Sequence, residues 1–407
     1  MLKTILLLSP DPPYPPNQGC RRDIWSHIEY FHEAGWRVVL VECRFGQNRR
    51  SELLQSLPIE IECHFIKRTP RWSAKERPGT ISRLQILVDK YQPLVVWCEY
   101  AHFSSLITQI DPGEAQVWFR PHNFELAHAI DKIFVEKPWS DWQGLSAPKQ
   151  ALKWVRNTTS NLINTFIKER LMFRCADKLF FISHGDKAAM SKFYAHSSNA
   201  TWLPTLIEAE TIPLKPNKAP LDVIYIGIQT SRKNPNFAGA LMLINQIIPA
   251  VEAAMPSVFR FHIVGKGSRE QFAQYESVNL IVHDYVEDLT ALMQQMDVAC
   301  FPIKFGWGCK IKVLEALVSG LPIIGASQTF RGLPQQKDKI CYACHSIADY
   351  VRAFQLLRNA SERQRLHQAG QIAYQNWVDQ GKSSLQSCLD SVGNKTDLDS
   401  IVVTREP

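Results

Sequence analysis

The sequence predicts an α/β protein of two domains, each built on a doubly wound parallel sheet, and three observations support this fold class. Short aliphatic runs alternate with longer stretches of helical periodicity in both halves of the chain, which is the order that gives a parallel sheet covered by helices. The 407 residues suffice for two domains, and 45% of them are hydrophobic, enough to fill two cores. A proline-rich segment near the middle of the chain reads as a linker.

The first half contains six candidate strands. They are residues 4–8, 38–42, 59–66, 94–98, 116–119 and 178–182. Between the first two, residues 22–34 place apolar side chains at helical spacing, and we expect Gly35 to end this helix. The order of strand, helix and strand predicts that the two strands pair in parallel.

The second half repeats this plan. Its candidate strands are residues 222–226, 259–264, 279–282, 298–301 and 321–324, and its candidate helices are residues 237–255, 289–296, 312–319 and 346–359. We therefore divide the chain into an N-terminal domain of residues 1–203, a linker of residues 204–220 and a C-terminal domain of residues 221–378. A terminal helix and a polar tail, frayed from about Gly393, follow over residues 379–407. Two doubly wound domains joined by a hinge predict a ligand cleft between them, at the carboxyl ends of strands.

Composition and charge exclude several classes of protein. Charged residues make up 21% of the chain, which excludes a disordered chain, a collagen-like fibre and a small disulfide scaffold. No apolar run approaches the roughly 20 residues that span a bilayer, and prolines stop the apolar start before it reaches the length of a signal sequence. We therefore expect a cytoplasmic protein whose ten cysteines stay reduced. The net charge is +7, and residues 1–200, with 26 basic and 20 acidic side chains, carry +6 of it.

The segment after the candidate strand 298–301 is the most specific motif. It contains Gly306, Gly308, Lys310, Lys312 and Glu315. Backbone amides freed by the glycines, with lysines at the start of a helix, suit a diphosphate, and a carboxylate one turn later can accept hydrogen bonds from a ribose diol. The alternative is a solvated basic helix start, but generic loops rarely place two glycines and two lysines in so few positions. We favour the binding site.

This segment resembles the donor-binding motif of the family-4 glycosyltransferases of GT-B fold, in the variant G-x-G-x-K-x-K-x-x-E-A. Residues 225–227 with 233–236, and residues 261–267, resemble the first two strand-and-loop segments of that family's nucleotide domain. The resemblance is good over residues 221–333 and looser in the first half. It implies two facing Rossmann-like domains with an inter-domain cleft. It further implies a retaining, metal-independent enzyme that moves a sugar from a nucleotide-diphosphate sugar to an acceptor hydroxyl.

The resemblance also assigns donor-binding residues position by position. Glu315 matches the glutamate that holds the ribose, and Lys233 matches the phosphate-binding lysine. This chain departs from the common form at Trp307, where the family has a second glutamate, and at Ile228, where it has an arginine. Lys310 and Arg232 can supply the lost positive charge, because a diphosphate needs donors rather than one particular side chain. The full predicted donor set is Gly19, Gly227, Lys233, Gly306, Gly308, Lys310 and Glu315, with Arg232, Lys312 and Glu125 as further candidates.

In the first half, His122 is the candidate catalytic residue. It follows the strand 116–119, and a histidine at the carboxyl end of a strand can donate to or position a reacting hydroxyl. The segment 122–125 resembles the family's H-N-x-E motif, in which Glu125 can equally brace the helix that follows. Gly19 precedes a helix after a proline-rich turn, where a ligand can approach backbone amides. Ser183 we interpret as a helix cap.

Two other patterns have competing interpretations. Residues 341–345 match the haem-attachment pattern C-x-x-C-H, but with no export signal or second metal-ligand pair we prefer a buried strand to haem or zinc. The basic stretch 67–77 fits contact with anionic lipid or a solvated loop about equally, and no nucleic-acid module accompanies it. Trp139, Trp142 and Trp154, with nearby lysines, form a second candidate contact patch or pack beside the cleft.

The sequence therefore predicts a glycosyltransferase for polysaccharide, glycolipid or other glycoconjugate synthesis. We expect no cofactor and no metal, a nucleotide-diphosphate sugar as donor, an anionic or lipid-linked acceptor, and no nucleic acid. The charge excess of the first half points to an anionic acceptor or to peripheral contact with the inner face of the membrane. Two alternatives stay open: a sugar-nucleotide epimerase or phosphorylase of the same fold, and a non-catalytic GT-B binding subunit, which the changes at Trp307 and Ile228 would permit.

Overall fold

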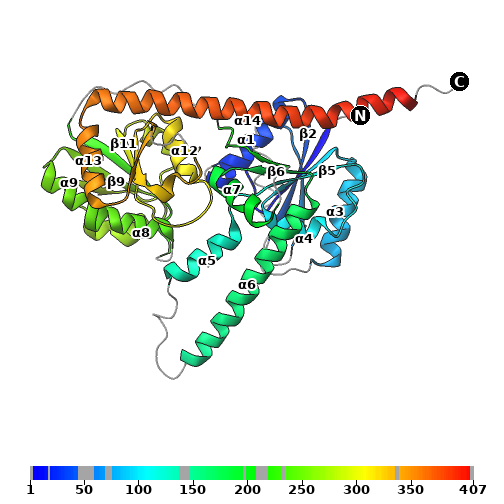
Figure 1. Cartoon of the computed structure of the whole chain (residues 1–407), viewed down its shortest axis with the longest axis horizontal. Coiled ribbons are helices and arrows are strands. Elements are labelled where there is room, and N and C mark those ends of the chain that lie inside the picture. Colours follow the sequence, from blue (N-terminus) through cyan, green and yellow to red (C-terminus); the bar gives the residue numbers. More distant parts are fainter. Residues whose placement is uncertain are drawn as a thin grey trace. The chain divides into compact units, whose positions relative to one another are not determined.

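The structure is a computed structural model of the whole chain, drawn in Figure 1. It describes residues 3–16, 19–44, 59–68, 76–136, 147–195, 199–207, 219–231, 234–334 and 339–403. The chain forms two compact units. Unit 1 consists of Met1–Leu206 and Asp379–Pro407, and unit 2 consists of Ile207–Val378.

Unit 1 is built on a seven-stranded sheet in the order β3-β2-β1-β4-β5-β6-β7, in which every pair of neighbours is parallel. The strands are β1 (Thr4–Ser9), β2 (Arg37–Arg44), β3 (Glu62–Lys67), β4 (Val95–Glu99), β5 (Gln116–Arg120), β6 (Lys178–Phe181) and β7 (Ala200–Trp202). The direction of winding reverses between β1 and β4. In open parallel sheets, ligands bind beyond the carboxyl ends of strands at such a switch point.

The helices of unit 1 connect the strands of this sheet. They are α1 (Gly19–Glu33), α3 (Pro78–Tyr91), η1 (Ala101–Phe103), α4 (Ser104–Ile107), α5 (Glu125–Glu136), α6 (Ala147–Cys175) and α7 (His184–Phe193). Aromatic side chains dominate the core: the Trp97 ring lies 5.2 Å from Phe180 and 6.2 Å from Trp118 between centroids. The predicted helix over residues 22–34 is confirmed, and Gly35, with φ +78°, ends it.

Unit 2 has a six-stranded parallel sheet in the order β10-β9-β8-β11-β12-β13. The strands are β8 (Leu221–Ile226), β9 (Phe259–Val264), β10 (Leu280–Val282), β11 (Val298–Phe301), β12 (Ile323–Ala326) and β13 (Cys341–Cys344). The helices are α8 (Pro235–Met242), η4 (Leu243–Ile247), α9 (Ile248–Ala254), α10 (Ser268–Phe272), η5 (Ala273–Tyr275), α11 (Leu289–Met293), α12 (Ile311–Val318), η6 (Ser327–Phe330) and α13 (Ile347–Leu357). The last helix, α14 (Ala360–Val403), belongs to unit 2 up to Val378 and to unit 1 from Asp379. Both units are thus doubly wound, as the sequence predicts.

Several local predictions differ from the structure. The single helix expected over residues 237–255 is interrupted by the π-helical turn η4, next to Pro249, which lacks an N–H for the regular ladder. The tail expected from Gly393 is instead helical to Val403, because one glycine inside a helix costs only about 1 kcal/mol. Strand β7 was not predicted, since three residues give no measurable alternation.

The residues that match the haem-attachment pattern form a strand, as predicted from the sequence. Cys341 and Cys344 begin and end β13, which pairs with β12 in parallel. Side chains three residues apart on a strand point to opposite faces of the sheet, so these two thiols do not face a common group.

One segment in the described part of the chain is long and apolar enough to cross a membrane, residues Pro235–Ala254. It forms α8, η4 and α9 of unit 2, and Phe237, Leu243 and Ile247 on it are buried. A helix that lies against a parallel sheet has this composition without spanning a bilayer.

Candidate functional site

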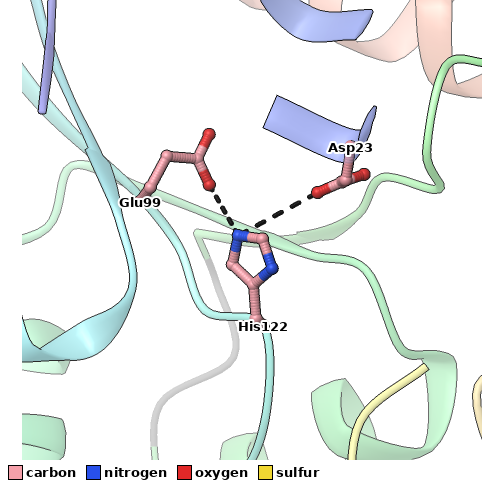
Figure 2. Close-up of side chains that lie close together, drawn as sticks. All are labelled: Asp23, Glu99 and His122. Carbon is pink, nitrogen blue, oxygen red and sulfur yellow. Dashed lines mark hydrogen bonds and ion pairs between the residues drawn. The ribbon is translucent and has the colours of Figure 1, made fainter. Parts of the chain in front are cut away.

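The candidate catalytic residue His122 lies two residues beyond β5, at the carboxyl edge of the unit 1 sheet and close to its switch point. Two carboxylates approach its ring from neighbouring elements. Glu99 is the last residue of β4, and Asp23 lies in the second turn of α1, the helix after β1. Figure 2 shows the three side chains converging on one point. The arrangement follows from the topology, because β1, β4 and β5 are consecutive strands of the sheet.

Asp23 forms a buried ion pair with Arg120, the last residue of β5. The Nε and Nη2 atoms of Arg120 donate to Oδ2 and Oδ1 of Asp23 at 2.9 and 2.8 Å, and both side chains are fully buried. Burial alone would raise the pKa of the Asp23 carboxyl, but the adjacent Arg120 guanidinium holds it well below its usual range. A bidentate pair of this kind fixes α1 to the end of β5.

His122 pairs with Glu99 through a single ring nitrogen. Its Nε2 atom lies 2.7 Å from Oε2 of Glu99 and 3.9 Å from Oδ2 of Asp23. The indole Nε1 of Trp97 donates to the other Glu99 oxygen at 2.6 Å. An ionised Glu99 can only accept, so Nε2 of His122 carries the proton. Among the described residues nothing bonds to Nδ1 of His122, which is therefore the ring atom that can meet a ligand.

Tyr100 holds the imidazole in place from one side. The two rings are stacked with centroids 4.0 Å apart and an interplanar angle of 10°. Tyr100 has φ +80° and ψ 144°, a region that residues other than glycine rarely occupy. Its backbone N–H donates to the carbonyl of Arg120 at 3.0 Å. Backbone strain of this kind concentrates at functional sites, and here it places the ring against His122.

Asp23, Glu99 and His122 could in principle hold a metal ion, because their ligand atoms lie within 4.8 Å of one another. Arg120 already occupies both oxygens of Asp23, and Trp97 occupies one oxygen of Glu99. A divalent cation would therefore compete with a guanidinium beside it. The donor set fits a histidine hydrogen-bonded to a carboxylate better than a cation site.

The two other predicted residues of unit 1 lie at helix starts. Gly19 is the first residue of α1, one turn before Asp23. Glu125 is the first residue of α5; its side chain accepts from Nδ2 of Asn123 at 3.0 Å, and its N–H donates to Glu169 at 2.7 Å. These contacts fit the bracing role for Glu125. A donor contact for either residue stays a prediction.

In unit 2 the donor loop lies between β11 and α12. Gly306 and Gly308 have φ values of +99° and +82°, where a side chain would cost about 1–2 kcal/mol. Lys310 is the N-cap residue of α12, with no side-chain cap on the helix, and its Nζ donates to the carbonyls of Gly306 and Trp307 at 3.1 and 2.8 Å. The loop thus ends at an uncapped helix N-terminus, which favours an anion.

Lys312, a further candidate for the donor set, makes its hydrogen bonds to neighbouring elements of unit 2, and a contact with the donor stays a prediction. Its Nζ donates to the carbonyl of Ile226 at the end of β8 and to Oδ1 of Asn236 at 2.7 Å. The pKa of Lys312 is lowered to about 7, chiefly by burial and also by the charge of Lys310, while the charge of Glu315 opposes the shift. Lys312 ties α12 to β8 and α8, so we interpret it as a support of the loop.

Gly227 is required by this close packing. It follows β8, and a Cβ there would lie 2.8 Å from Cβ of Asn236 and 3.0 Å from Nζ of Lys312. On its other side, a Cβ on Gly265 would lie 2.0 Å from the carbonyl oxygen of Gly227. The first two strand-to-helix loops of unit 2 therefore touch through their glycines.

Glu315 lies in α12 and its side chain is buried. Lys233 and Arg232 fall outside the described residues, so their roles in binding a phosphate stay predictions.

Some residues at these sites were not found from the sequence. In unit 1 they are Asp23, Glu99 and Arg120, none of which stands in a motif. In unit 2, the Arg331 guanidinium lies 3.2 Å from the ring centroid of Trp307. Trp307 was noted only as a departure, and the arginine after Phe330 carried no signal. The pair places a cation beside the loop at the position where the common motif has a glutamate.

Comparisons with known proteins agree with this architecture. Residues 222–360 match the family model of the glycosyl transferases group 1. Among curated proteins none matches the sequence significantly. The match identifies a glycosyltransferase group 1 domain within unit 2, and the two doubly wound parallel sheets match the GT-B fold of solved glycosyltransferase structures.

Solved structures of similar fold cover almost the whole chain. Sucrose-phosphate synthase from Thermosynechococcus elongatus has a TM-score of 0.68 at 13% identity, covering 97% of this chain and 100% of its own. HepE from Anabaena, in complex with UDP and glucose, has 0.62 at 13%, covering 96% and 100%. WaaG, a glycosyltransferase involved in lipopolysaccharide biosynthesis, has 0.60 at 14%, covering 95% and 99%. At these identities the likeness establishes the fold; the family-4 assignment and the donor-loop variant stay predictions.

Proposed function

We propose that the protein is a retaining, metal-independent glycosyltransferase that moves a sugar from a nucleotide-diphosphate sugar to an acceptor hydroxyl in glycoconjugate synthesis. The observation that carries this proposal is the donor loop of unit 2. Gly306 and Gly308, both at positive φ, lead into the uncapped N-terminus of α12 within the glycosyltransferase group 1 domain. One relative of this fold, HepE, was solved with UDP and glucose, which makes a nucleotide sugar the first donor to test.

In this proposal unit 2 binds the donor. The diphosphate lies against the backbone amides at the start of α12, and Lys310 turns from the loop carbonyls to the phosphates. Glu315 accepts hydrogen bonds from the ribose diol. Negative charge develops on the departing nucleoside diphosphate as the glycosidic bond breaks. The lysine and the amides stabilise that charge, so the reaction needs no metal ion.

Unit 1 binds the reacting hydroxyls. Nδ1 of His122 accepts a proton from, or hydrogen-bonds to, a sugar hydroxyl, while Nε2–H stays on Glu99. Glu99 stabilises the imidazolium that forms, and Tyr100 holds the ring plane. We further propose that an anionic or lipid-linked acceptor binds on the same unit and that the protein works in the cytoplasm at the inner face of the membrane.

The donor assignment is tested by isothermal titration with UDP, GDP and ADP. We expect one nucleotide to bind, and Lys310→Ala and Glu315→Ala each to weaken it about 10-fold or more, since a hydrogen bond to a charged group contributes about 1.5–3 kcal/mol. The matched control is Lys339→Ala, an exposed lysine of the same unit. Unchanged affinity in both loop variants would refute the assignment.

Product analysis separates this activity from the alternatives. With the bound nucleotide's sugars as donors and added acceptors, a retaining transferase gives a product whose anomeric configuration, read by NMR, matches the donor. Epimerised sugar nucleotide formed without acceptor would indicate the epimerase. Sugar phosphate formed from a glycoside and added inorganic phosphate would indicate the phosphorylase. Nucleotide binding with no turnover of any donor would indicate a binding subunit. Full activity in excess EDTA is expected, and its loss would contradict metal independence.

A further inference from the structure

Helix α6 exposes an apolar stripe that the proposed reaction does not use. Among its 29 residues, Leu152, Val155, Ile163 and Ile167 have exposed fractions of 72, 49, 53 and 37%. Isolated exposed apolar residues are ordinary, whereas a row of them on one element indicates an interaction surface. In the described part of unit 1 only three other large apolar side chains are as exposed, and they lie on three other helices.

The four side chains share one face of the helix. They are separated by three, eight and four residues, which at 3.6 residues per turn keeps them within one stripe. The opposite face, toward the C-terminal end, packs on unit 1: the carbonyl of Lys168 accepts from Ser104, and Glu169 accepts from Tyr194. From residue 148 to residue 161, α6 has no buried residue, and Figure 1 shows its first turns projecting beyond the sheet of its own unit.

The exposed charges on this helix all have the same sign. Every exposed charged side chain described on α6 is basic: Lys149, Lys153, Arg156, Arg170 and Arg174. Its one acidic residue, Glu169, is buried. Residues 147–195 hold nine basic and three acidic side chains, a net charge of +6, which equals the whole excess of residues 1–200. In the basic stretch 67–77, Arg68 is buried and paired with Glu76, whereas residues 69–75, with Arg71 and Lys75, lie outside the described residues.

We propose that α6 binds the surface of an anionic lipid bilayer, lying in the interface with its apolar stripe toward the acyl chains and its basic side chains on the phosphate headgroups. At 3.6 residues per turn, four of the five exposed basic side chains lie on the same face of α6 as the stripe, and Lys153 borders it. Their long side chains can reach the headgroups from between and beside the apolar residues, as lysine and arginine do at membrane interfaces. Among the described residues, the one helical segment apolar enough to cross a bilayer is Pro235–Ala254 and not α6. A second copy of the chain is a less suitable partner for the stripe than a bilayer. Pairing two such stripes would bring basic side chains against basic side chains, and like charges repel.

Sedimentation of the full-length protein with vesicles tests the proposal. We expect binding to vesicles of phosphatidylcholine with about 30% phosphatidylserine, weak binding to phosphatidylcholine alone, and loss of binding in high salt. The double variant Lys153→Gln/Arg156→Gln should bind about 30-fold less tightly, at about 1 kcal/mol for each basic residue near the surface. Leu152→Ser/Ile163→Ser should bind about 10-fold less tightly, because it removes apolar area from the stripe.

A matched control exists on another helix of the same unit. Arg83 and Ile86 lie three residues apart on α3, and both are exposed, Ile86 at 61%. The variant Arg83→Gln/Ile86→Ser should bind as the parent does. Unchanged thermal unfolding and UDP affinity in the α6 variants would exclude misfolding and keep this test separate from the donor site. Equal binding to neutral and anionic vesicles, wild-type binding in both α6 variants, or a solution dimer that these variants dissociate would each overturn the proposal.

Discussion

The Nε2 atom of His122 lies 2.7 Å from Oε2 of Glu99, and Glu99 is fully buried at the carboxyl end of β4. Trp97 donates to one oxygen of Glu99, and the His122 imidazole lies against the other. The pair therefore fixes both the tautomer and the orientation of the ring. Glu99 acts through His122 and is therefore a positioning residue.

We predict that Glu99→Gln lowers the rate of sugar transfer about 10²- to 10⁴-fold, because a glutamine can donate to Nε2 and reverse the tautomer. Affinity for UDP should not change, since the donor loop is untouched. Initial rates and a titration measure the two quantities. A merely structural role would lower thermal stability and leave the pH profile of the residual activity unchanged, whereas a positioning role shifts that profile.

Asp23→Asn should instead destabilise unit 1. The variant leaves the fully buried Arg120 without its bidentate partner, and breaking a buried ion pair from one side costs about 3–5 kcal/mol. The surface pair of Arg37 with Glu62, with side chains 41 and 36% exposed, is the control: Arg37→Gln should cost less than about 1 kcal/mol. Chemical denaturation measures the free energy of unfolding of both variants. Equal losses would contradict a special role of the buried pair in stability.

Much of the fold could be predicted from the sequence, since alternating strands and helices leave few arrangements of a parallel sheet. His122 was found because it stands in a local motif after a strand. Glu99 was not found, because it is one acidic residue after an apolar run, and its role depends on β4 and β5 pairing so that Glu99 stands opposite Arg120. Asp23 meets Arg120 across 97 positions, a distance at which no local pattern exists.

In the donor loop, too, some residues could be predicted from the sequence and others could not. The glycines and Lys310 were predicted from spacing, and the structure explains the glycines by their positive φ values. The role of Lys312 could not be predicted, because the carbonyl of Ile226 that it binds lies 86 positions away. The Arg331–Trp307 contact was likewise invisible, since it depends on how the segment after η6 packs.

Gly308→Ala should weaken UDP binding about 5- to 30-fold. With φ +82°, an alanine there costs about 1–2 kcal/mol, which the loop relieves by moving its amides. Gly79→Ala is the control: Gly79 lies in the first turn of α3, with nothing within 4 Å of an added Cβ, and should be neutral or up to about 1 kcal/mol more stable. Titration and thermal unfolding distinguish them; unchanged UDP affinity in Gly308→Ala would show that the loop conformation is not used in binding.

The lowered pKa of Lys312 implies that the stability of the protein depends on pH. Its pKa is lowered to about 7 in the folded protein, chiefly by burial, whereas an unfolded lysine titrates near 10.4. Between these values the unfolded chain binds more protons, so this residue's contribution to stability rises as pH increases above 7. Below pH 7 both states are protonated, and the folded state carries the full cost of the buried charge.

Lys312→Met removes this titration. The stability of the parent relative to Lys312→Met should therefore increase from pH 7 to pH 9, by less than the limit of about 1.4 kcal/mol per pH unit for one proton. Denaturant midpoints for both proteins at pH 6, 7, 8 and 9 measure it. Lys339→Met, at an exposed site in the same unit, should differ from the parent by a constant. A constant difference for Lys312→Met as well would show that Lys312 keeps its charge throughout, and its bonds to Ile226 and Asn236 would then be those of an ammonium group.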